Sequence, residues 1–226
     1  MHNNHIVDGF NKDIDLVKTR EWYLGLIKGW EDPFGSPTVK LHDDFFVVRD
    51  DLIEYGSKCR FGDYLVKNCE YDTLVYVQPR FGFAGISLSY LAKKYNKKLV
   101  LFMPSSKEIS EHQAVCIEGG ATVKFRRIAA MPNLNRIAKK WAEENNAFFI
   151  PLGLVHPLVT ASIVKTCESI IQEWGYPKEV WCAISTGVLS RGLQIGFPNA
   201  TFHSVAVARN LKEGELGYAQ VYSHKK

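Results

Sequence analysis

Residues 72–103 have the sequence DTLVYVQPRFGFAGISLSYLAKKYNKKLVLFM, which contains a strand, a helix and a second strand. Leu74-Val75-Tyr76-Val77 is a continuous apolar run, and residues 98–103 form a second run that Pro104 closes. Between the two runs, residues 85–95 carry apolar side chains at helical spacing. Strands that are solidly apolar rather than alternating are typical of a parallel sheet buried on both faces.

The same alternation continues toward the C-terminus. We expect helices at 110–118, 134–145, 158–174 and 189–196, and strands at 122–125, 148–150, 180–184 and 201–207. This order predicts an α/β fold with a doubly wound, mostly parallel sheet and helices on both faces. Ligands of such sheets bind beyond the carboxyl ends of the strands, which directs attention to the loops at 78–85, 150–157 and 185–190.

The residues before this core differ in pattern. Residues 45–48 form a short apolar run between acidic pairs and predict a strand. Residues 15–30 have the spacing of an amphipathic helix, which ends near Pro33 and Gly35. We therefore expect residues 1–35 to form an N-terminal helical extension of the core.

Composition excludes several classes of protein. The chain has 226 residues, of which 46% are hydrophobic and 23% charged, as in an ordinary globular protein rather than a disordered or fibrous one. It has no apolar run of membrane-spanning length, and its polar N-terminus does not resemble a secretory signal, so we expect a cytoplasmic location and no membrane partner. A net charge of +4 is weak evidence for a polyanionic partner.

The cysteines and histidines do not indicate a metal site. The five cysteines are widely spaced and form no CxxC pair, which is typical of reduced, mostly buried thiols. The seven histidines have no metal-binding spacing. His156 is of interest because it lies in the loop at 150–157, although a lone loop histidine is more often incidental.

The loop Ser185-Thr186-Gly187-Val188-Leu189-Ser190 follows an expected strand and opens an expected helix. The free backbone N–H groups at a helix N-terminus, together with two hydroxyl groups and a glycine, suit a phosphate. The loop matches neither the Walker A nor the GxGxxG pattern. The alternative is a turn of small residues in which Ser or Thr caps the helix.

Lys58 lies in the segment Gly56-Ser57-Lys58-Cys59-Arg60, which follows the strand expected at 45–48. A lysine is usually a solvated surface charge. A desolvated lysine beside other cations loses its proton more readily and can attack a carbonyl group, as is needed to hold an aldehyde cofactor as a Schiff base.

These segments together resemble the fold-type II pyridoxal-phosphate enzymes, the superfamily of cysteine synthase, threonine synthase and tryptophan synthase β. The resemblance runs in the same order over residues 36–207. Its segments are Ser36 to Leu41 (the family's TPLxxL), Phe46 to Arg60 (its lysine segment), Val77 to Ala92 (its SSGNHG loop and helix), Met103-Pro104, Glu118 to Val123 (its GAxV) and Ser185 to Leu189 (its glycine-rich loop). The lysine segment is most similar to that of the branch of 1-aminocyclopropane-1-carboxylate deaminase and D-cysteine desulfhydrase.

The resemblance implies a tryptophan synthase β-like fold with pyridoxal 5′-phosphate as cofactor. Residues 36–226 would form the cofactor-binding domain, in which 72–150 can be a smaller inserted subdomain. Lys58 falls on the Schiff-base lysine, and the loop 185–190 falls on the phosphate site. Arg80, Phe81, Gly82, Phe83 and Ala84 fall on the loop that binds the substrate carboxylate in the family.

The departures from the family are equally specific. Phe83 stands where the family has the asparagine that bonds the phenolic oxygen of the cofactor, so this side-chain donor is missing. Arg80 can bind the carboxylate in its place or can be exposed to solvent. The chain is also shorter than the family beyond residue 207. Val221-Tyr222-Ser223-His224-Lys225 resembles the VY[ST]GK segment, in which the hydroxyl group faces the pyridine nitrogen, so Ser223 is a candidate for that role; the alternative is a frayed polar tail.

Two functions follow as hypotheses. The first is an enzyme of the lyase, deaminase or decarboxylase type that acts at the α-carbon of an amino acid or amine, with Lys58 as the catalytic base. Its substrate can be a small amino acid or, as in phage-type short relatives, an amino acid attached to a nucleobase in DNA modification. The second is a catalytically silent descendant that serves as a ligand-binding or interaction module.

We also expect a homodimer, with residues 15–30 or 210–226 in or near the interface.

Overall fold

The computed structural model describes residues 18–127, 130–207, 211 and 214–223. The chain divides into two compact units, and each is described here by itself. The central unit comprises Arg49–Leu154, and the terminal unit comprises Met1–Val48 together with Val155–Lys226.

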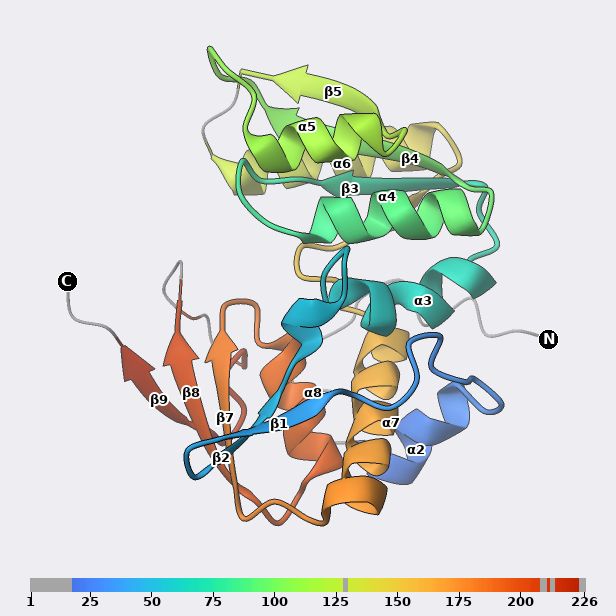
Figure 1. The fold of residues 1–226 in the computed structure, drawn as a ribbon. Helices are drawn as coiled ribbons and strands as arrows, with labels where there is room; N and C mark the ends of the chain where they lie inside the picture. Colours follow the sequence, from blue (N-terminus) through green and yellow to red (C-terminus); the bar gives the residue numbers. More distant parts are fainter. Residues whose placement is uncertain (1–17, 128–129, 208–210, 212–213, 224–226) are drawn as a thin grey trace. The chain divides into compact units, whose positions relative to one another are not determined.

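The central unit is built on a four-stranded sheet in the order β5-β4-β3-β6, with all strands parallel. Figure 1 labels β5, β4 and β3 of this sheet. Its strands are β3 (Thr73–Val77), β4 (Lys98–Pro104), β5 (Thr122–Arg126) and β6 (Phe148–Ile150). Its helices are the short 3-10 helix η2 (Asp50–Leu52), α3 (Lys58–Asn68), α4 (Ala84–Lys94), α5 (Glu111–Glu118) and α6 (Met131–Glu144).

Both faces of this sheet are covered. Alternate strand residues such as Val75 and Phe102 pack against Leu134, Ala138 and Ala142 of α6. The residues between them, which point to the other face, lie on the side of α4, and α4 in turn contacts α3 and α5. This arrangement explains why the strand sequences are solidly apolar.

The terminal unit contains a three-stranded parallel sheet and a hairpin. The sheet has the order β7-β8-β9, from β7 (Glu179–Ile184), β8 (Thr201–Ala206) and β9 (Gln220–Ser223). The hairpin pairs β1 (Val39–His42) with β2 (Phe45–Val48) in antiparallel register. The helices of the unit are α2 (Arg20–Leu26), α7 (Pro157–Trp174) and α8 (Val188–Gly196).

The N-terminal helix is shorter than expected and has a partner. Tyr23 and Ile27 are buried, and α2 packs on α7, where Arg20 bonds Glu168 at 3.1 Å. The apolar side of this helix therefore packs within its own unit. Residues 15–17 of the expected helix lie outside the described residues.

The α/β class and the parallel strands predicted from the sequence are confirmed, and nearly every expected strand and helix of the core is present. The strands, however, belong to two separate parallel sheets, β5-β4-β3-β6 and β7-β8-β9, and α7 connects β6 to β7. Within the described residues, no helix is long and apolar enough to cross a membrane.

Candidate functional site

Lys58 is the first residue of α3, a helix that the sequence pattern did not predict. The helix is preceded by Gly56, which has φ +83°, and by Ser57 at the N-cap position. Burial lowers the pKa of the Lys58 ammonium group below its ordinary value. A lysine in this state reaches its neutral, nucleophilic form at a lower pH than a solvated lysine does.

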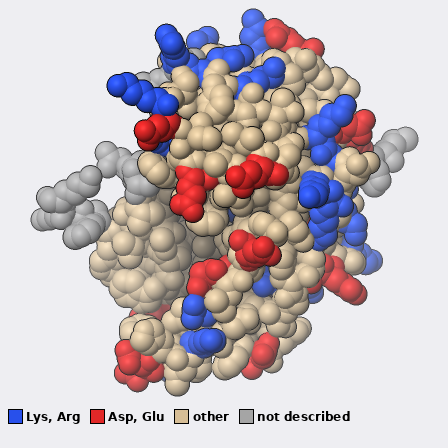
Figure 2. Space-filling view, turned by 45° about the horizontal axis from the view of Figure 1, so that its top comes forward, with Lys and Arg blue, Asp and Glu red and all other residues tan. Residues whose placement is uncertain are grey.

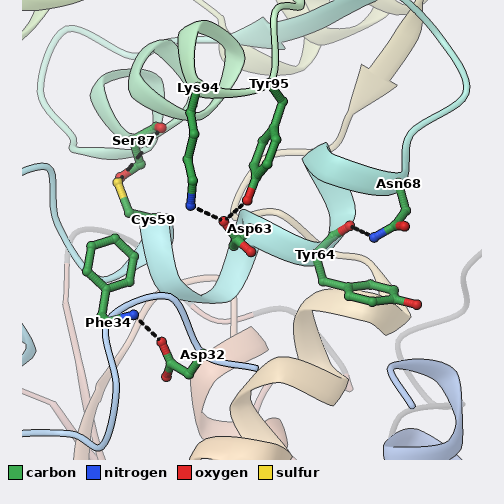
Figure 3. A network of polar contacts seen from close by, with 9 residues as sticks. All are labelled: Asp32, Phe34, Cys59, Asp63, Tyr64, Asn68, Ser87, Lys94 and Tyr95. Carbon is green, nitrogen blue, oxygen red and sulfur yellow. Dashed lines mark hydrogen bonds and ion pairs between the residues drawn. The ribbon is translucent and has the colours of Figure 1, made fainter. Parts of the chain in front are cut away.

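Helix α3 is fixed to α4 at Cys59, the residue after Lys58, and Figure 3 shows the contact between Cys59 and Ser87. The Cys59 thiol lies 3.8 Å from the Ser87 carbonyl oxygen, and the Ser87 hydroxyl donates to the Tyr55 carbonyl at 2.6 Å. The Tyr55 ring also stacks on Tyr90 of α4 at a centroid distance of 4.5 Å. These contacts hold the residues on both sides of Lys58 against the first turns of α4.

A second group of contacts fixes the middle of α3 to the other end of α4. The buried Asp63 carboxylate accepts a hydrogen bond from Lys94 Nζ at 2.9 Å and another from the Tyr95 hydroxyl (Figure 3). Lys58 is thus carried by a helix that is anchored at two points, which limits the movement of its backbone.

Hydrogen bonds from two side chains fix the backbone of the loop between β3 and α4, which contains Arg80 to Ala84. The buried Gln78 side chain donates to the Gly82 carbonyl at 2.8 Å and accepts from the Gly85 N–H at 2.8 Å. The Ser110 hydroxyl donates to the Arg80 carbonyl. The loop therefore has a defined backbone conformation, although the sequence pattern gave no sign of the role of Gln78.

These contacts also orient the amides of the loop. No peptide bond of the described chain is cis, so the N–H that follows each carbonyl points the opposite way. The N–H groups of Phe81 and Phe83 consequently point away from Ser110 and Gln78. Within the described residues, neither amide donates to a protein acceptor.

The loop carries two exposed phenyl rings. Phe81 is 68% exposed and Phe83 is 54% exposed, and both rings stand nearly perpendicular to the ring of His112. Arg80 is exposed, with its guanidinium group 5.8 Å from the centre of the Phe81 ring. Phe83 also packs against Gly56, where an added Cβ would lie 3.3 Å from the Phe83 Cβ. The loop and the segment that carries Lys58 are therefore in contact.

In the terminal unit, the loop from Ser185 to Gly187 connects β7 to α8. Gly187 has φ +78°, and a Cβ on it would overlap the Glu215 carbonyl oxygen and the Arg191 guanidinium, so only glycine fits. Helix α8 begins at Val188, and among the residues that the structure describes no side chain caps its N-terminus. The first N–H groups of α8 are thus available to an anion.

The side chains of this loop differ in their surroundings. Ser185 and Thr186 are partly exposed, Val188 is buried, and Leu189 is exposed. The buried Ser190 hydroxyl pairs with Ser204 at 3.0 Å. At Ser190, only the backbone is therefore open to a ligand beyond the loop.

The buried Arg191 side chain fixes the backbone of the β7–α8 loop. This role was not predicted from the sequence, because arginine side chains are normally on the surface. Arg191 is fully buried, and its Nη1 donates to the carbonyls of Thr186 at 3.3 Å and Glu215 at 3.1 Å. It therefore connects the loop to the segment that leads to β9.

Residues Gln220–Ser223 form strand β9, whereas His224 and Lys225 of the same segment lie outside the described residues. In the sheet register, Ile184 lies beside Ala206, and Ala206 lies beside Ser223. The backbone of Ser223 is thus at the same edge of the sheet as the loop that follows Ile184. The side chain of Ser223 lies outside the described residues.

His156 is a helix cap. Its Nδ1 accepts a hydrogen bond from the Leu158 N–H at 3.2 Å at the start of α7, and burial lowers its pKa to about 4. Within the described residues, no group of His, Cys, Asp and Glu side chains could hold a metal ion.

The fold is similar to several solved structures. One is described as an ACC deaminase homologue; it has a TM-score of 0.76 and 17% identity, over 91% of this chain and 76% of that one. Threonine deaminase isoform 2 from Solanum lycopersicum matches with a TM-score of 0.67 and 13% identity, over 91% of this chain and 57% of that one. A pyridoxal 5′-phosphate-dependent aspartate racemase matches with a TM-score of 0.61 and 14% identity, over 71% and 50% of the two chains.

No protein-family model matches the chain, and no curated protein matches it by sequence. At these low identities the structural likeness identifies the fold. The chain spans about half of the two longer proteins and three quarters of the ACC deaminase homologue.

Proposed function

We propose that this chain, whose fold is that of the fold-type II pyridoxal-phosphate enzymes, binds pyridoxal 5′-phosphate at Lys58 and acts at the α-carbon of an amino acid or amine. The observation that carries the proposal is Lys58 itself, the first residue of an anchored helix, with a pKa lowered by burial. When bound, the cofactor supplies an electron sink for negative charge that develops at the α-carbon.

The residues of the β7–α8 loop fit the phosphate of this cofactor. An uncapped helix N-terminus presents N–H groups and the positive end of the helix dipole, and the hydroxyl groups of Ser185 and Thr186 add polar donors beside it. Gly187 lets the backbone turn there. The donor set thus consists of backbone N–H groups and hydroxyl groups, which suit an anion.

The β3–α4 loop fits the substrate carboxylate. The N–H groups of Phe81 and Phe83 point away from the groups that hold the loop and have no described acceptor, and the loop leads into the N-terminus of α4. Arg80 adds a cation beside Phe81. Phe83 offers no side-chain donor, so the contact to the carboxylate would come from the backbone and from Arg80.

Lys58 would have two roles in the reaction. Its amine would hold the cofactor aldehyde, and after substrate binding the free Lys58 Nζ would accept the proton from the α-carbon. Deamination, elimination, racemisation and decarboxylation differ in which bond at that carbon breaks, and we propose the lyase or deaminase type in keeping with the deaminases among the similar structures.

The experiment is cofactor fixation. The chain incubated with pyridoxal phosphate should turn yellow, and borohydride should fix the cofactor to the peptide that contains Lys58. Lys58→Ala should abolish fixation, whereas Lys67→Ala, which removes an exposed lysine from the same helix, should leave it unchanged. A colourless wild-type chain would favour the silent module, and fixation on another lysine would refute the assignment of Lys58.

Two finer proposals remain. In the face seen in Figure 2, Asp and Glu side chains lie among the Lys and Arg side chains, unlike the one-sided basic surface of many nucleic-acid-binding proteins, so this face does not support an amino acid attached to DNA as the substrate. A homodimer would cover apolar surface such as the exposed Leu41, Phe45 and Phe46 of the hairpin. Light scattering tests it.

A further inference from the structure

Phe81, Phe83 and His112 form a cluster, here called the aromatic cluster, whose geometry is fixed by the backbone. Both phenyl rings stand nearly perpendicular to the His112 ring, at centroid distances of 6.2 Å for Phe81 and 5.1 Å for Phe83. Perpendicular contacts are a favoured geometry of aromatic pairs. One imidazole ring therefore positions two phenyl rings that are separated by one residue.

The backbone conformation of the loop makes this possible. Gly82, between the two phenylalanines, has φ +145°, which a residue with a side chain rarely adopts. Gln78 and Ser110 bond the carbonyls on either side. The rings are thus presented by a fixed loop, unlike single apolar side chains scattered over a surface, which need no explanation.

The rings retain a large accessible area despite these contacts. Phe81 and Phe83 are both more than half exposed, and the Arg80 guanidinium lies over the Phe81 ring. An exposed pair of phenyl rings beside a cation can take up a flat, electron-rich group by stacking and by cation–π contact. The same loop carries the two amides that would bind the substrate carboxylate, so such a group would belong to the same molecule.

We infer that the aromatic cluster selects a substrate with a planar aromatic side chain over one with an aliphatic side chain. The inference rests on the proposed function, because it takes the β3–α4 loop as the carboxylate-binding loop. Phe81 and Phe83 are then specificity-determining residues. His112 is a positioning residue, which acts by orienting the two phenyl rings.

The test compares two ligands that differ in planarity. L-phenylalanine and L-cyclohexylalanine have the same carbon skeleton, but only the first has a flat ring. Calorimetric titration of the full chain loaded with pyridoxal phosphate should give about two- to tenfold tighter binding of L-phenylalanine, as expected for a single aromatic contact. Equal affinity, tighter binding of cyclohexylalanine or no binding of either ligand would overturn the inference.

Variants locate the effect. Phe81→Leu and Phe83→Leu keep apolar bulk and remove the flat rings, so each should reduce the preference for L-phenylalanine, and together they should abolish it. Phe125→Leu, which changes a partly exposed phenylalanine of β5, should leave the preference unchanged. An unchanged preference in the double variant would refute the cluster as its source.

The proposed function is tested by a different measurement from the one that tests this inference. Visible absorption and borohydride fixation report whether Lys58 holds the cofactor, whereas the titrations report ring preference. A chain that holds its cofactor and shows no ring preference would refute only this inference. A chain that has no cofactor at Lys58 would refute the proposed function and, with it, the inference that rests on it.

Discussion

Gly56 and Phe83 are packed so closely that a methyl group on Gly56 would lie 3.3 Å from the Phe83 Cβ. Gly56 comes two residues before Lys58, and Phe83 ends the loop that leads into α4. Both lie in the central unit, and the contact connects the segment of the candidate catalytic lysine to the candidate carboxylate loop. A change at either residue should therefore affect the other.

Gly56→Ala tests this coupling. The positive φ of Gly56 alone should cost about 1–2 kcal/mol in free energy of unfolding once a side chain is present. Crowding against Phe83 should add to this loss and should weaken cofactor binding. Urea unfolding and cofactor titration measure the two effects.

Gly120→Ala is the matched control, because Gly120 has φ +89° in the same unit and no atom of a described residue would lie within 4 Å of an added Cβ. It should show the loss due to backbone strain and leave cofactor affinity unchanged. Equal effects of the two substitutions would show that the contact with Phe83 is energetically unimportant.

The pairing of Asp63 with Lys94 and Tyr95 should stabilise the packing of α3 on α4. Asp63→Asn removes the charge of a buried acceptor, so the free energy of unfolding should fall by about 1–2 kcal/mol, limited because Lys94 can still reach water. Glu143→Gln, which breaks the exposed pair with Lys139, should change stability by less than about 0.5 kcal/mol. Equal small losses in urea unfolding would contradict the assigned role of Asp63.

His156 should make the chain sensitive to acid. Burial lowers its folded-state pKa from 6.5 to about 4, so between these values the unfolded state binds a proton that the native state does not. The native state therefore loses stability as pH falls through this window, by about 3 kcal/mol in all for a shift of this size. Urea unfolding at pH 7 and pH 4.5 should reveal most of this loss.

His156→Asn should reduce the pH dependence, because asparagine can still cap α7 but does not titrate. His42→Asn, at an exposed position, should leave it unchanged. If all three proteins lost the same stability on acidification, another group would be responsible.

Most core elements could be predicted because strands such as β3, β4 and β6 are apolar runs and several helices end at a stop signal, such as Gly175 after α7. The division into two sheets could not, because apolar runs do not specify which strands pair. Helix α3 was missed because it buries Arg60 and Asp63, which disguise its apolar face.

The site was predictable to a similar extent. The loop at 185–190 and the helix after it could be predicted, because small residues come directly before an apolar stretch. The residues that hold the loops, Gln78 and Arg191, were not predictable, since buried polar side chains are recognised only by partners distant in sequence.

Gln194 should hold the segment before β9 in place. Its amide donates to Ser190 Oγ at 3.0 Å and to the Leu216 carbonyl at 2.9 Å, and its carbonyl accepts from the Tyr218 N–H at 2.9 Å. Gln194→Leu removes the partner of the Leu216 carbonyl and of the Tyr218 N–H, and should cost about 2–4 kcal/mol. Hydrogen exchange at the Tyr218 amide should accelerate.

Gln194→Glu keeps the acceptor for Tyr218 and loses the donors, so the Tyr218 amide should stay protected relative to the leucine variant. Gln172→Leu, on the exposed side of α7, should have no effect on this amide. Fast exchange at Tyr218 in the wild-type chain would contradict the role given to Gln194.

Lys58→Met should stabilise the chain without cofactor, and the gain should depend on pH. Because the folded-state pKa of Lys58 is lowered, the native state releases its proton before the unfolded state does. The penalty for burying the charge is complete below the folded-state pKa and declines as pH rises from there to about 10.5, the value for an unperturbed lysine. Urea unfolding should therefore show a larger gain for Lys58→Met at pH 7 than at pH 10, and Lys67→Met should show no such trend. A gain for Lys58→Met that is equal at both pH values would mean that Lys58 is not desolvated, and would remove the physical reason for regarding it as the nucleophile.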